Sequence, residues 1–191
     1  MVEASTTRTR VFVDIDGVLN VDRPDLSDWS EKSWRRRQVY IRSHGIRVWV
    51  TYSTSVVDAL REIAALPGVE MMWCTTWEAA APEAFGREVG IGTGWPHVAS
   101  AAQPADADWW KAAAVKGSHK AGYRVVWLDD EIDSWICRPG RPDSEVLGAA
   151  WVDNAEVLTV SCDPRIGLTD AEVVDIQEFI AIGRRPRRDD E

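Results

Sequence analysis

The chain has 191 residues, of which 45% are hydrophobic and 28% are charged, an ordinary composition for a soluble globular protein. This length allows one domain with a sizeable core but hardly two. No apolar run approaches the roughly 18 residues that a membrane-spanning helix needs, and residues 1–10 lack the apolar stretch of a secretory signal. We therefore expect no membrane association and a cytoplasmic location. A net charge of −9 argues against a protein that coats nucleic acid non-specifically.

The charge is unevenly distributed, because residues 32–47 hold six basic residues and no acidic one. The basic residues are Lys32, Arg35, Arg36, Arg37, Arg42 and Arg47. We call residues 32–47 the basic segment. The rest of the chain consequently carries a net charge of −15.

The three cysteines, Cys74, Cys137 and Cys162, show neither CxxC pairing nor metal-finger spacing. A disulfide framework or a zinc site is therefore not expected. We expect all of them to be buried thiols.

In chain order, the first predicted element is a buried parallel strand over 10–15 (RVFVDI), because this run is short, apolar and β-branched and leads into Asp16-Gly17. Residues 20–34 are rich in Asp, Pro, Ser and Trp without a clear period, which indicates a loop. The runs 38–42 and 46–52 have strand character on either side of a glycine turn and predict a β-hairpin. The basic segment lies on and just before this hairpin.

Apolar residues then recur at helical spacing from Val56 to Leu66, and Pro67-Gly68 ends this predicted helix. The next predicted elements are a strand over 69–74, a helix over 77–89 with a kink or boundary at Pro82, a loop over 90–104, a helix over about 107–120, and strands over 123–128 and 156–162. Thr169 and Glu172 have the spacing of a capping box, which predicts a helix to about Ile182. The charged tail, residues 184–191, is expected to be disordered.

The alternation of strands and helices predicts an α/β protein, a Rossmann-like three-layer sandwich with a central parallel sheet and a small β-hairpin insert. We expect one domain over residues 1–183, with the cap-like insert covering about residues 20–53. Trp49, Trp73 and Trp127 lie within predicted strands and are expected to pack in the core or against the sheet.

Polar side chains follow three of the predicted strands. They are Asp14 and Asp16 after the first, Thr75 and Thr76 after the strand over 69–74, and Asp129 and Asp130 after the strand over 123–128. Ligands of parallel sheets bind beyond the carboxyl ends of the strands. These side chains are therefore expected to converge on one site.

The same segments resemble a known superfamily. VFVDIDGVLN, the apolar strand before Thr75, and WLDDE resemble the first, second and fourth motifs of haloacid dehalogenase-like (HAD) hydrolases, in that order and over roughly residues 10–132. DGVLN, WCTTWE and WLDDE are most similar to the HAD domains of Swiss-army-knife RNA-repair proteins. The resemblance implies a magnesium-dependent phosphatase with Asp14 as its nucleophile.

The resemblance also assigns roles within the first motif. Asp14 attacks phosphorus and binds Mg²⁺, which cancels the repulsion between carboxylate and phosphate. Asp16 binds the metal through its carbonyl and protonates the leaving oxygen, and it then acts as the base that promotes hydrolysis of the aspartyl phosphate. Gly17 allows the tight turn that follows.

The other motifs supply metal ligands and a phosphate cradle. Mg²⁺ needs one or two further carboxylates, for which Asp129 and Asp130 are available. We favour Asp130 as the direct ligand and Asp129 as a ligand through water, although the sequence does not separate them. Thr75 is expected to place its hydroxyl and its backbone N–H on phosphoryl oxygens, with Thr76 as its close rival.

A lysine of the third motif must offset the charge of the nucleophile and the phosphate. The resemblance favours Lys111, early in the helix before the fourth-motif strand, and it leaves Lys116 and Lys120 as alternatives.

Each motif also has an ordinary explanation. A DxDG sequence occurs in calcium loops, but here Val18-Leu19 replace the alternating oxygen ligands that such a loop needs. Asp129-Asp130 alone would be a solvated strand end, and Thr75 could be a helix N-cap. The order and number of the matches favour the catalytic interpretation.

The basic segment is the feature that bears on substrate. Arg35, Arg36 and Arg37 lie between the first and second motifs and are expected to reach phosphate groups near the site. Interleaved aromatic residues are Trp29, Trp34, Tyr40 and Trp49. Charge combined with aromatic stacking is typical of single-strand binding, and a solvated hairpin face is the alternative. Trp77 is a further candidate for substrate contact.

Taken together, these patterns predict a phosphomonoester phosphatase whose candidate substrates are terminal phosphates of nucleic acids or nucleotides, as in RNA repair. One alternative is a small-molecule phosphatase that acts on a sugar phosphate or a nucleotide. Another is a binding module that keeps the fold without turnover. The sequence does not indicate an oligomeric state.

Overall fold

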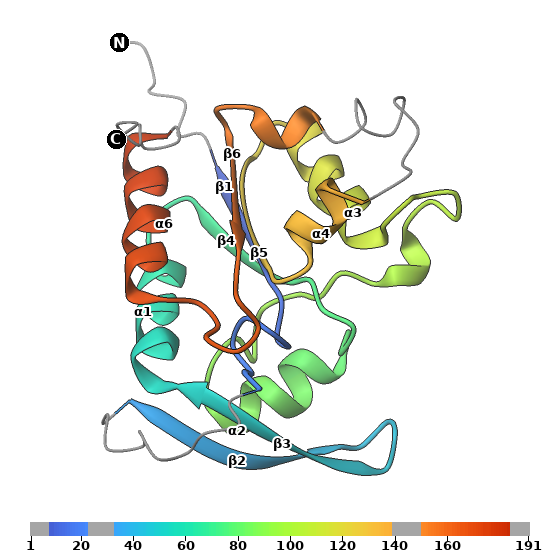
Figure 1. Cartoon of the computed structure of the whole chain (residues 1–191), viewed down its shortest axis with the longest axis vertical. Coiled ribbons are helices and arrows are strands. Elements are labelled where there is room, and N and C mark those ends of the chain that lie inside the picture. The colour runs from blue at the N-terminus through green and yellow to red at the C-terminus, as the bar shows by residue number, and fades with distance from the viewer. Residues whose placement is uncertain (1–7, 23–32, 139–149, 184–191) are drawn as a thin grey trace.

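The computed structural model describes residues 8–22, 33–138 and 150–183. Its centre is a sheet of four parallel strands in the order β4-β1-β5-β6 (Figure 1). The strands are β1 (Thr9–Val13), β4 (Val69–Trp73), β5 (Arg124–Asp129) and β6 (Val157–Ser161). Val11 of β1 pairs with Met71 on one side and with Val126 on the other, so β1 is an interior strand. The sequence prediction of a parallel sheet is confirmed.

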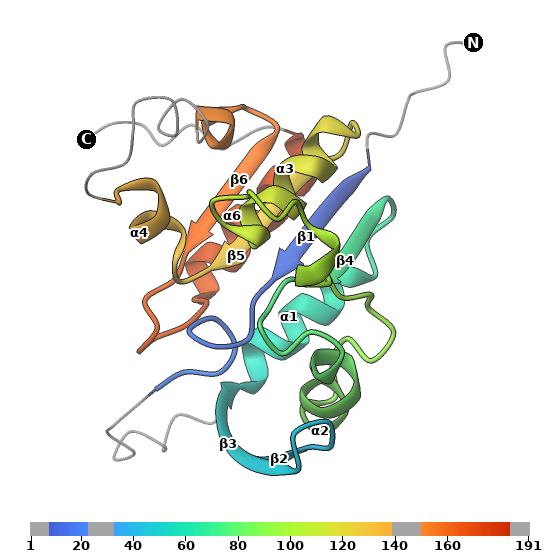
Figure 2. The ribbon, with the colours of Figure 1, turned by 90° about the vertical axis from the view of Figure 1, so that its right-hand side faces the viewer.

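Helices cover both faces of the sheet, as Figures 1 and 2 show. One face carries α1 (Thr54–Ala64) and α6 (Asp170–Ile182), and the other carries α3 (Trp110–Lys120) and α4 (Ile132–Ile136). Successive side chains of β1 point to opposite faces of the sheet, which explains the two helical layers. Val11 and Val13 pack with α1 and α6, while Phe12 packs with α3 and α4. The Rossmann-like three-layer prediction is therefore confirmed.

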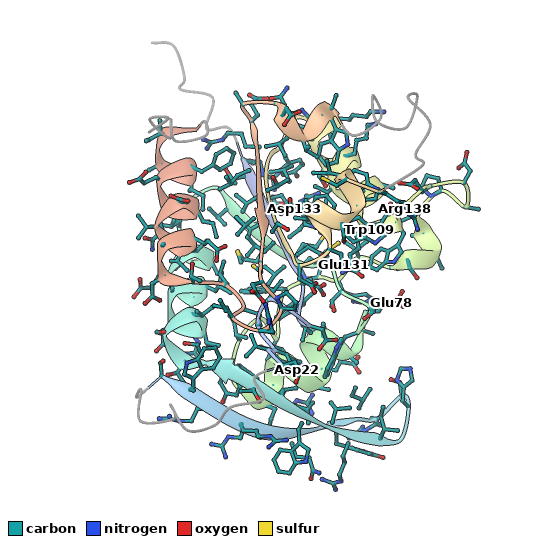
Figure 3. All side chains as sticks on the ribbon, in the orientation of Figure 1. Asp22, Glu78, Trp109, Glu131, Asp133 and Arg138 are labelled. Carbon is teal, nitrogen blue, oxygen red and sulfur yellow. The ribbon has the colours of Figure 1, made fainter. Side chains whose placement is uncertain are left out.

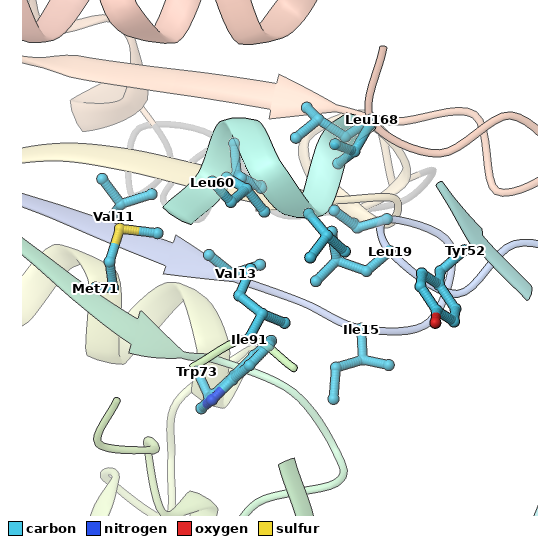
Figure 4. Packing of buried hydrophobic residues seen from close by; sticks show 14 of the residues in the cluster. Val11, Val13, Ile15, Leu19, Tyr52, Leu60, Met71, Trp73, Ile91 and Leu168 are labelled. Carbon is cyan, nitrogen blue, oxygen red and sulfur yellow. The ribbon is translucent and has the colours of Figure 1, made fainter. Parts of the chain in front are cut away.

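The larger core lies between the sheet and the α1–α6 layer and continues toward the hairpin. Figure 4 shows Val11 and Val13 beside Leu60, with Ile15 and Tyr52 further along. The capping box of α6 is present, since the Thr169 hydroxyl accepts from the Glu172 backbone N–H and the Glu172 carboxylate accepts from the Thr169 backbone N–H. This local signal was read correctly from the sequence.

The helical segments differ from the sequence prediction in extent and number. The helix expected over 77–89 is a π-helix, η1 (Ala81–Gly86), followed by α2 (Arg87–Val89). Pro82 lies in the first turn of η1, where its missing N–H costs nothing, so of the two expected alternatives it marks the helix boundary and not a kink. The sequence did not indicate α4 or the short 3₁₀ turns η2 (Ser100–Ala102) and η3 (Ala150–Asp153).

The insert forms the predicted hairpin from β2 (Trp34–Ile41) and β3 (Ile46–Ser53). In Figures 1 and 2 it lies beyond the carboxyl ends of the sheet strands. Val39 and Val50 on one face of the hairpin are buried in the core. Trp49 is on the opposite face and is 57% exposed, so the prediction that it packs in the core is wrong, whereas Trp73 and Trp127 are buried as expected.

Two of the cysteines, Cys74 and Cys162, are buried as predicted, but Cys137 is exposed after α4. Within the described part of the chain, no helix is both long enough and apolar enough to cross a membrane. Lys32, Trp29 and the tail 184–191 fall outside the described residues.

Candidate active site

The strand order brings the predicted motifs together. Asp14 follows β1, Thr75 follows the neighbouring strand β4, and Asp129 ends β5 on the other side of β1. Parallel neighbours end at the same edge of the sheet, so these side chains meet beyond that edge. Asp14, Thr75 and Asp129 are all buried.

Lys111 connects two of these carboxylates from the first turn of α3. Its Nζ lies 2.5 Å from Asp14 Oδ2 and 2.8 Å from Asp129 Oδ2, and the side chain is buried. Burial alone would lower the pKa of Lys111, but the two carboxylates raise it above its usual value, so the ammonium stays charged. Lys120 is exposed, and neither it nor Lys116 lines the cleft described below.

The Asp14 carboxylate is held at both oxygens. The Ile15 backbone N–H donates to Oδ1 over 2.7 Å, and Lys111 donates to Oδ2. Burial raises the pKa of Asp14, while Lys111 and a hydrogen bond from the Thr75 hydroxyl act against this rise. These three donors fix the orientation of the Asp14 carboxylate at the end of β1.

The acidic pair after β5 divides into a buried and an accessible residue. Asp129 is fully buried and also accepts from the Glu131 backbone N–H over 3.0 Å. Burial and the nearby Asp14 raise the pKa of Asp129 to about 7. Asp130 lines the cleft, and burial together with Asp14 raises its pKa as well. A side chain at Gly17 would collide with the Asp130 carboxyl, so Gly17 is needed for space as well as for its φ of +75°.

The Asp16 carboxylate is fixed by two side-chain donors. Trp77 Nε1 donates to its Oδ2 and Asn20 Nδ2 donates to its Oδ1, both over 2.7 Å. The Asn20 side-chain oxygen in turn accepts from the Thr51 backbone N–H over 2.9 Å. Trp77, expected to contact substrate, thus contacts Asp16, and Asn20 ties the loop after β1 to β3 of the hairpin.

These side chains border a cleft of about 730 Å³. It is lined by Asp14, Asp16, Gly17, Asn20, Val21, Asp22, Arg36, Trp49, Thr51, Thr76, Lys111, Asp130, Glu131 and Pro164. Asp22 and Glu131 are labelled in Figure 3. Of the three consecutive arginines, Arg36 lines the cleft while Arg35 and Arg37 do not. Thr76 also lines it, whereas Thr75 lies beneath, against Asp14.

The carboxylates suit a small, hard divalent cation. Asp14, Asp129 and Asp130 offer oxygens that all lie within 4.8 Å of one another. In the described part of the chain, Lys111 is the one cation paired with them, so negative charge is left in excess. Carboxylate oxygens with room for water are what Mg²⁺ prefers, and the residues present therefore fit this ion.

Several residues of this site were not predicted from the sequence, and three of them are polar residues near the first motif or the hairpin. Asn20 and Thr51 connect the hairpin to Asp16, and Asp22 lines the cleft. Asn20 did carry a signal, because it is a polar residue between the apolar Leu19 and Val21. The role of Thr51 depends on which face of the hairpin turns to the cleft, and no local pattern shows this.

Residues 10–173 match a family model whose description is HAD domain in Swiss Army Knife RNA repair proteins. The matched range runs from β1 into α6 and includes every residue of the cleft. No curated protein and no solved structure is significantly similar to the chain.

Proposed function

The chain belongs to the family of HAD domains found in Swiss Army Knife RNA repair proteins, and we propose that it is a magnesium-dependent phosphomonoester phosphatase with Asp14 as nucleophile. Membership of this family supports a phosphatase-like hydrolase in general. The single observation that carries the finer proposal is the buried Lys111 ammonium between Asp14 and Asp129, with Asp130 beside them at the cleft. A structural ion pair would not need a third carboxylate facing an open cleft.

In the proposed reaction, an Asp14 oxygen attacks the phosphorus of the substrate, and the bond to the leaving oxygen breaks. Lys111 favours the ionised form of the Asp14 carboxylate, against the effect of burial, and offsets part of the negative charge that the phosphate brings. Thr75 orients Asp14 through its hydroxyl, and Thr76 faces the cleft, where it can donate to phosphoryl oxygens.

In this proposal Asp16 acts as general acid and then as general base. It lines the cleft next to Asp14, and it would donate a proton to the leaving oxygen. In the second step it would take a proton from the water that hydrolyses the aspartyl phosphate, which returns Asp14 to its starting state. Trp77 and Asn20 hold Asp16 in place for both steps.

Asp14, Asp130 and the Asp16 carbonyl would hold Mg²⁺, with Asp129 acting through water. When bound, Mg²⁺ supplies the positive charge that lets a carboxylate approach a phosphate dianion and that stabilises the transferring group. The Gly17 turn leaves the space that the Asp130 carboxyl occupies.

The proposed substrates are terminal phosphates of nucleic acids or nucleotides. Support comes from Arg36, which brings the charge of the basic segment into the cleft, and from the family, whose members occur in RNA repair proteins. Arg35 and Arg37 do not line the cleft, so Arg36 is the arginine of this group that we now propose for phosphate binding.

An aryl phosphate assay with Mg²⁺ tests the reaction. Asp14→Asn should lower turnover by about a thousand-fold or more, whereas Asp58→Asn, an equal change of charge on the exposed side of α1, should keep it. Wild-type protein quenched in acid should carry a phosphate that hydroxylamine releases, as expected for an acyl phosphate. Hydrolysis that survives Asp14→Asn, or the absence of hydrolysis with any phosphomonoester, would contradict the proposal.

A further inference from the structure

The solvent-facing side of the hairpin carries an ordered set of basic and aromatic side chains. Antiparallel pairing places Arg36 opposite Thr51, Gln38 opposite Trp49 and Tyr40 opposite Arg47. Residues two apart along a strand, and residues directly opposite each other, point to the same side, so these residues share one face of the hairpin. We call Arg36, Gln38, Tyr40, Arg47 and Trp49 the outer strip.

Each aromatic ring of the outer strip is paired with an arginine. The Arg36 guanidinium carbon lies 4.9 Å from the centre of the Trp49 ring, and that of Arg47 lies 5.3 Å from the centre of the Tyr40 ring. Trp49 is 57% exposed and Tyr40 is 48% exposed. A guanidinium on one side of each ring leaves the rest of the ring available for stacking on a planar ligand.

The strip has the charge that a phosphate polymer needs. Residues 33–53 contain five arginines and no acidic residue, in a chain whose net charge is −9. Arg36 and Arg47 have no carboxylate partner among the described residues. Arginine fits the phosphate group with two parallel hydrogen bonds, and it also stacks on planar rings.

The strip is continuous with the candidate active site. Arg36 and Trp49 line the cleft together with Asp14, while Tyr40 and Arg47 lie one step further toward the hairpin turn. Trp49 and Tyr40 are diagonal neighbours across the two strands, for which Cα atoms are about 7–8 Å apart. A single nucleotide with its phosphate at Asp14 could reach Trp49, but a longer chain is needed to cover Tyr40 and Arg47 as well.

We propose that the outer strip binds a single-stranded polynucleotide whose terminal phosphate lies at Asp14, with one base stacked on Trp49 and the next on Tyr40. This inference rests on the proposed function for the position of the terminal phosphate. Arg36 and Arg47 bind the phosphates between these nucleotides. The strip therefore selects a polymer end over a free nucleotide, and it does so with stacking and charge, which carry little sequence preference.

The test measures binding separately from turnover, with the full chain carrying Asp14→Asn in the presence of Mg²⁺. The ligands are labelled oligonucleotides of one to five nucleotides, prepared both as RNA and as DNA, with a terminal phosphate at either the 5′ or the 3′ end. Their binding is titrated by fluorescence anisotropy. Affinity should increase between one and three nucleotides and then level off. Adding Tyr40→Ala should weaken binding of the three-nucleotide ligand by about 5- to 100-fold, the range for losing one stacked base.

Arg47→Gln should lower the slope of log affinity against log salt concentration by about 0.7, the value for one phosphate contact with a single strand. Arg37→Gln is the matched control, because it removes the same charge from the opposite face of the same hairpin. Equal losses for Arg37→Gln and Arg47→Gln would show a general charge effect and overturn the proposal. So would equal affinity for one and five nucleotides, or tighter binding of a phosphorylated acidic peptide.

Parallel aryl phosphate assays on the wild-type chain keep the two proposals separate. Hydrolysis without length-dependent oligonucleotide binding would overturn the outer strip and leave the phosphatase standing. Length-dependent binding that requires Tyr40, without any phosphomonoester hydrolysis, would support the strip and reject the phosphatase.

Discussion

Replacing Gly17 with alanine separates the space that this residue provides from its backbone conformation. Gly17 has a φ of +75°, and the nearest atoms to an added Cβ belong to the Asp130 carboxyl group. A left-handed conformation costs an alanine about 1–2 kcal/mol. For a chain of this size that corresponds to a melting temperature lower by about 2–8 °C. Displacement of Asp130 should add a second effect, a loss of Mg²⁺ affinity of about 10- to 100-fold.

Gly68→Ala is the matched control, because Gly68 has a φ of +79° and no atom within 4 Å of an added Cβ. Without Mg²⁺, calorimetry should show that Gly17→Ala loses at least as much stability as Gly68→Ala, because its Cβ also displaces Asp130. Mg²⁺ titrations and aryl phosphate turnover should then distinguish them, with the affinity and rate lowered in Gly17→Ala alone. A Mg²⁺ affinity of Gly17→Ala within two-fold of that of Gly68→Ala would contradict this prediction.

Two further predictions follow from the charges around the site. The pKa of Asp129 is about 7 in the folded chain and 3.8 in the unfolded chain, so the folded state binds this proton more tightly. Without Mg²⁺, the free energy of unfolding should therefore fall as the pH rises from about 4 to 7. Protons compete with the metal, so calorimetry should show that Mg²⁺ raises the melting temperature more at pH 8 than at pH 5.5, and an equal rise at both would contradict this. Trp77→Phe removes the indole donor to Asp16, and it should slow hydrolysis of an alkyl phosphate by about 5- to 10-fold through loss of one hydrogen bond. An aryl phosphate, whose leaving group needs little protonation, should be affected much less, and equal slowing of both would leave Trp77 with only a structural role.

The parallel sheet and the motif residues could be predicted because their signals are local, whereas the order of the strands carries no such signal. A short β-branched run before Asp14 and a capping box at Thr169 depend on a few neighbouring residues, and the structure places both as the sequence indicates. Lys111 was favoured among three lysines by its position early in the helix. Its burial between Asp14 and Asp129 depends on where α3 packs, which the sequence does not show.

The incorrect predictions and the missed contacts concern residues whose surroundings come from distant parts of the chain. Trp49 has the same strand pattern as a core residue, but its face of the hairpin turns to the cleft. The hydrogen bond from the Trp77 indole to Asp16 was missed for the same reason, because nothing local shows that the two side chains lie within hydrogen-bonding distance. Contact of Trp77 with substrate stays a prediction. Cys137 follows the short helix α4, which has no clear signal, so its exposure could not be inferred.

The interior position of β1 has a consequence for how the activity relates to folding. Val13 pairs with Trp73 and with Leu128, so the strand that precedes Asp14 obtains its second neighbour only after most of the chain has been added. The partners of Asp14 arrive in the same late segments, since Lys111 and Asp129 belong to α3 and β5. A chain that ends before β5 keeps Asp14 and Lys111 but lacks Asp129 and Asp130. Metal binding should therefore report the pairing of β5 with β1, and chains without this pairing should be unable to take up phosphate.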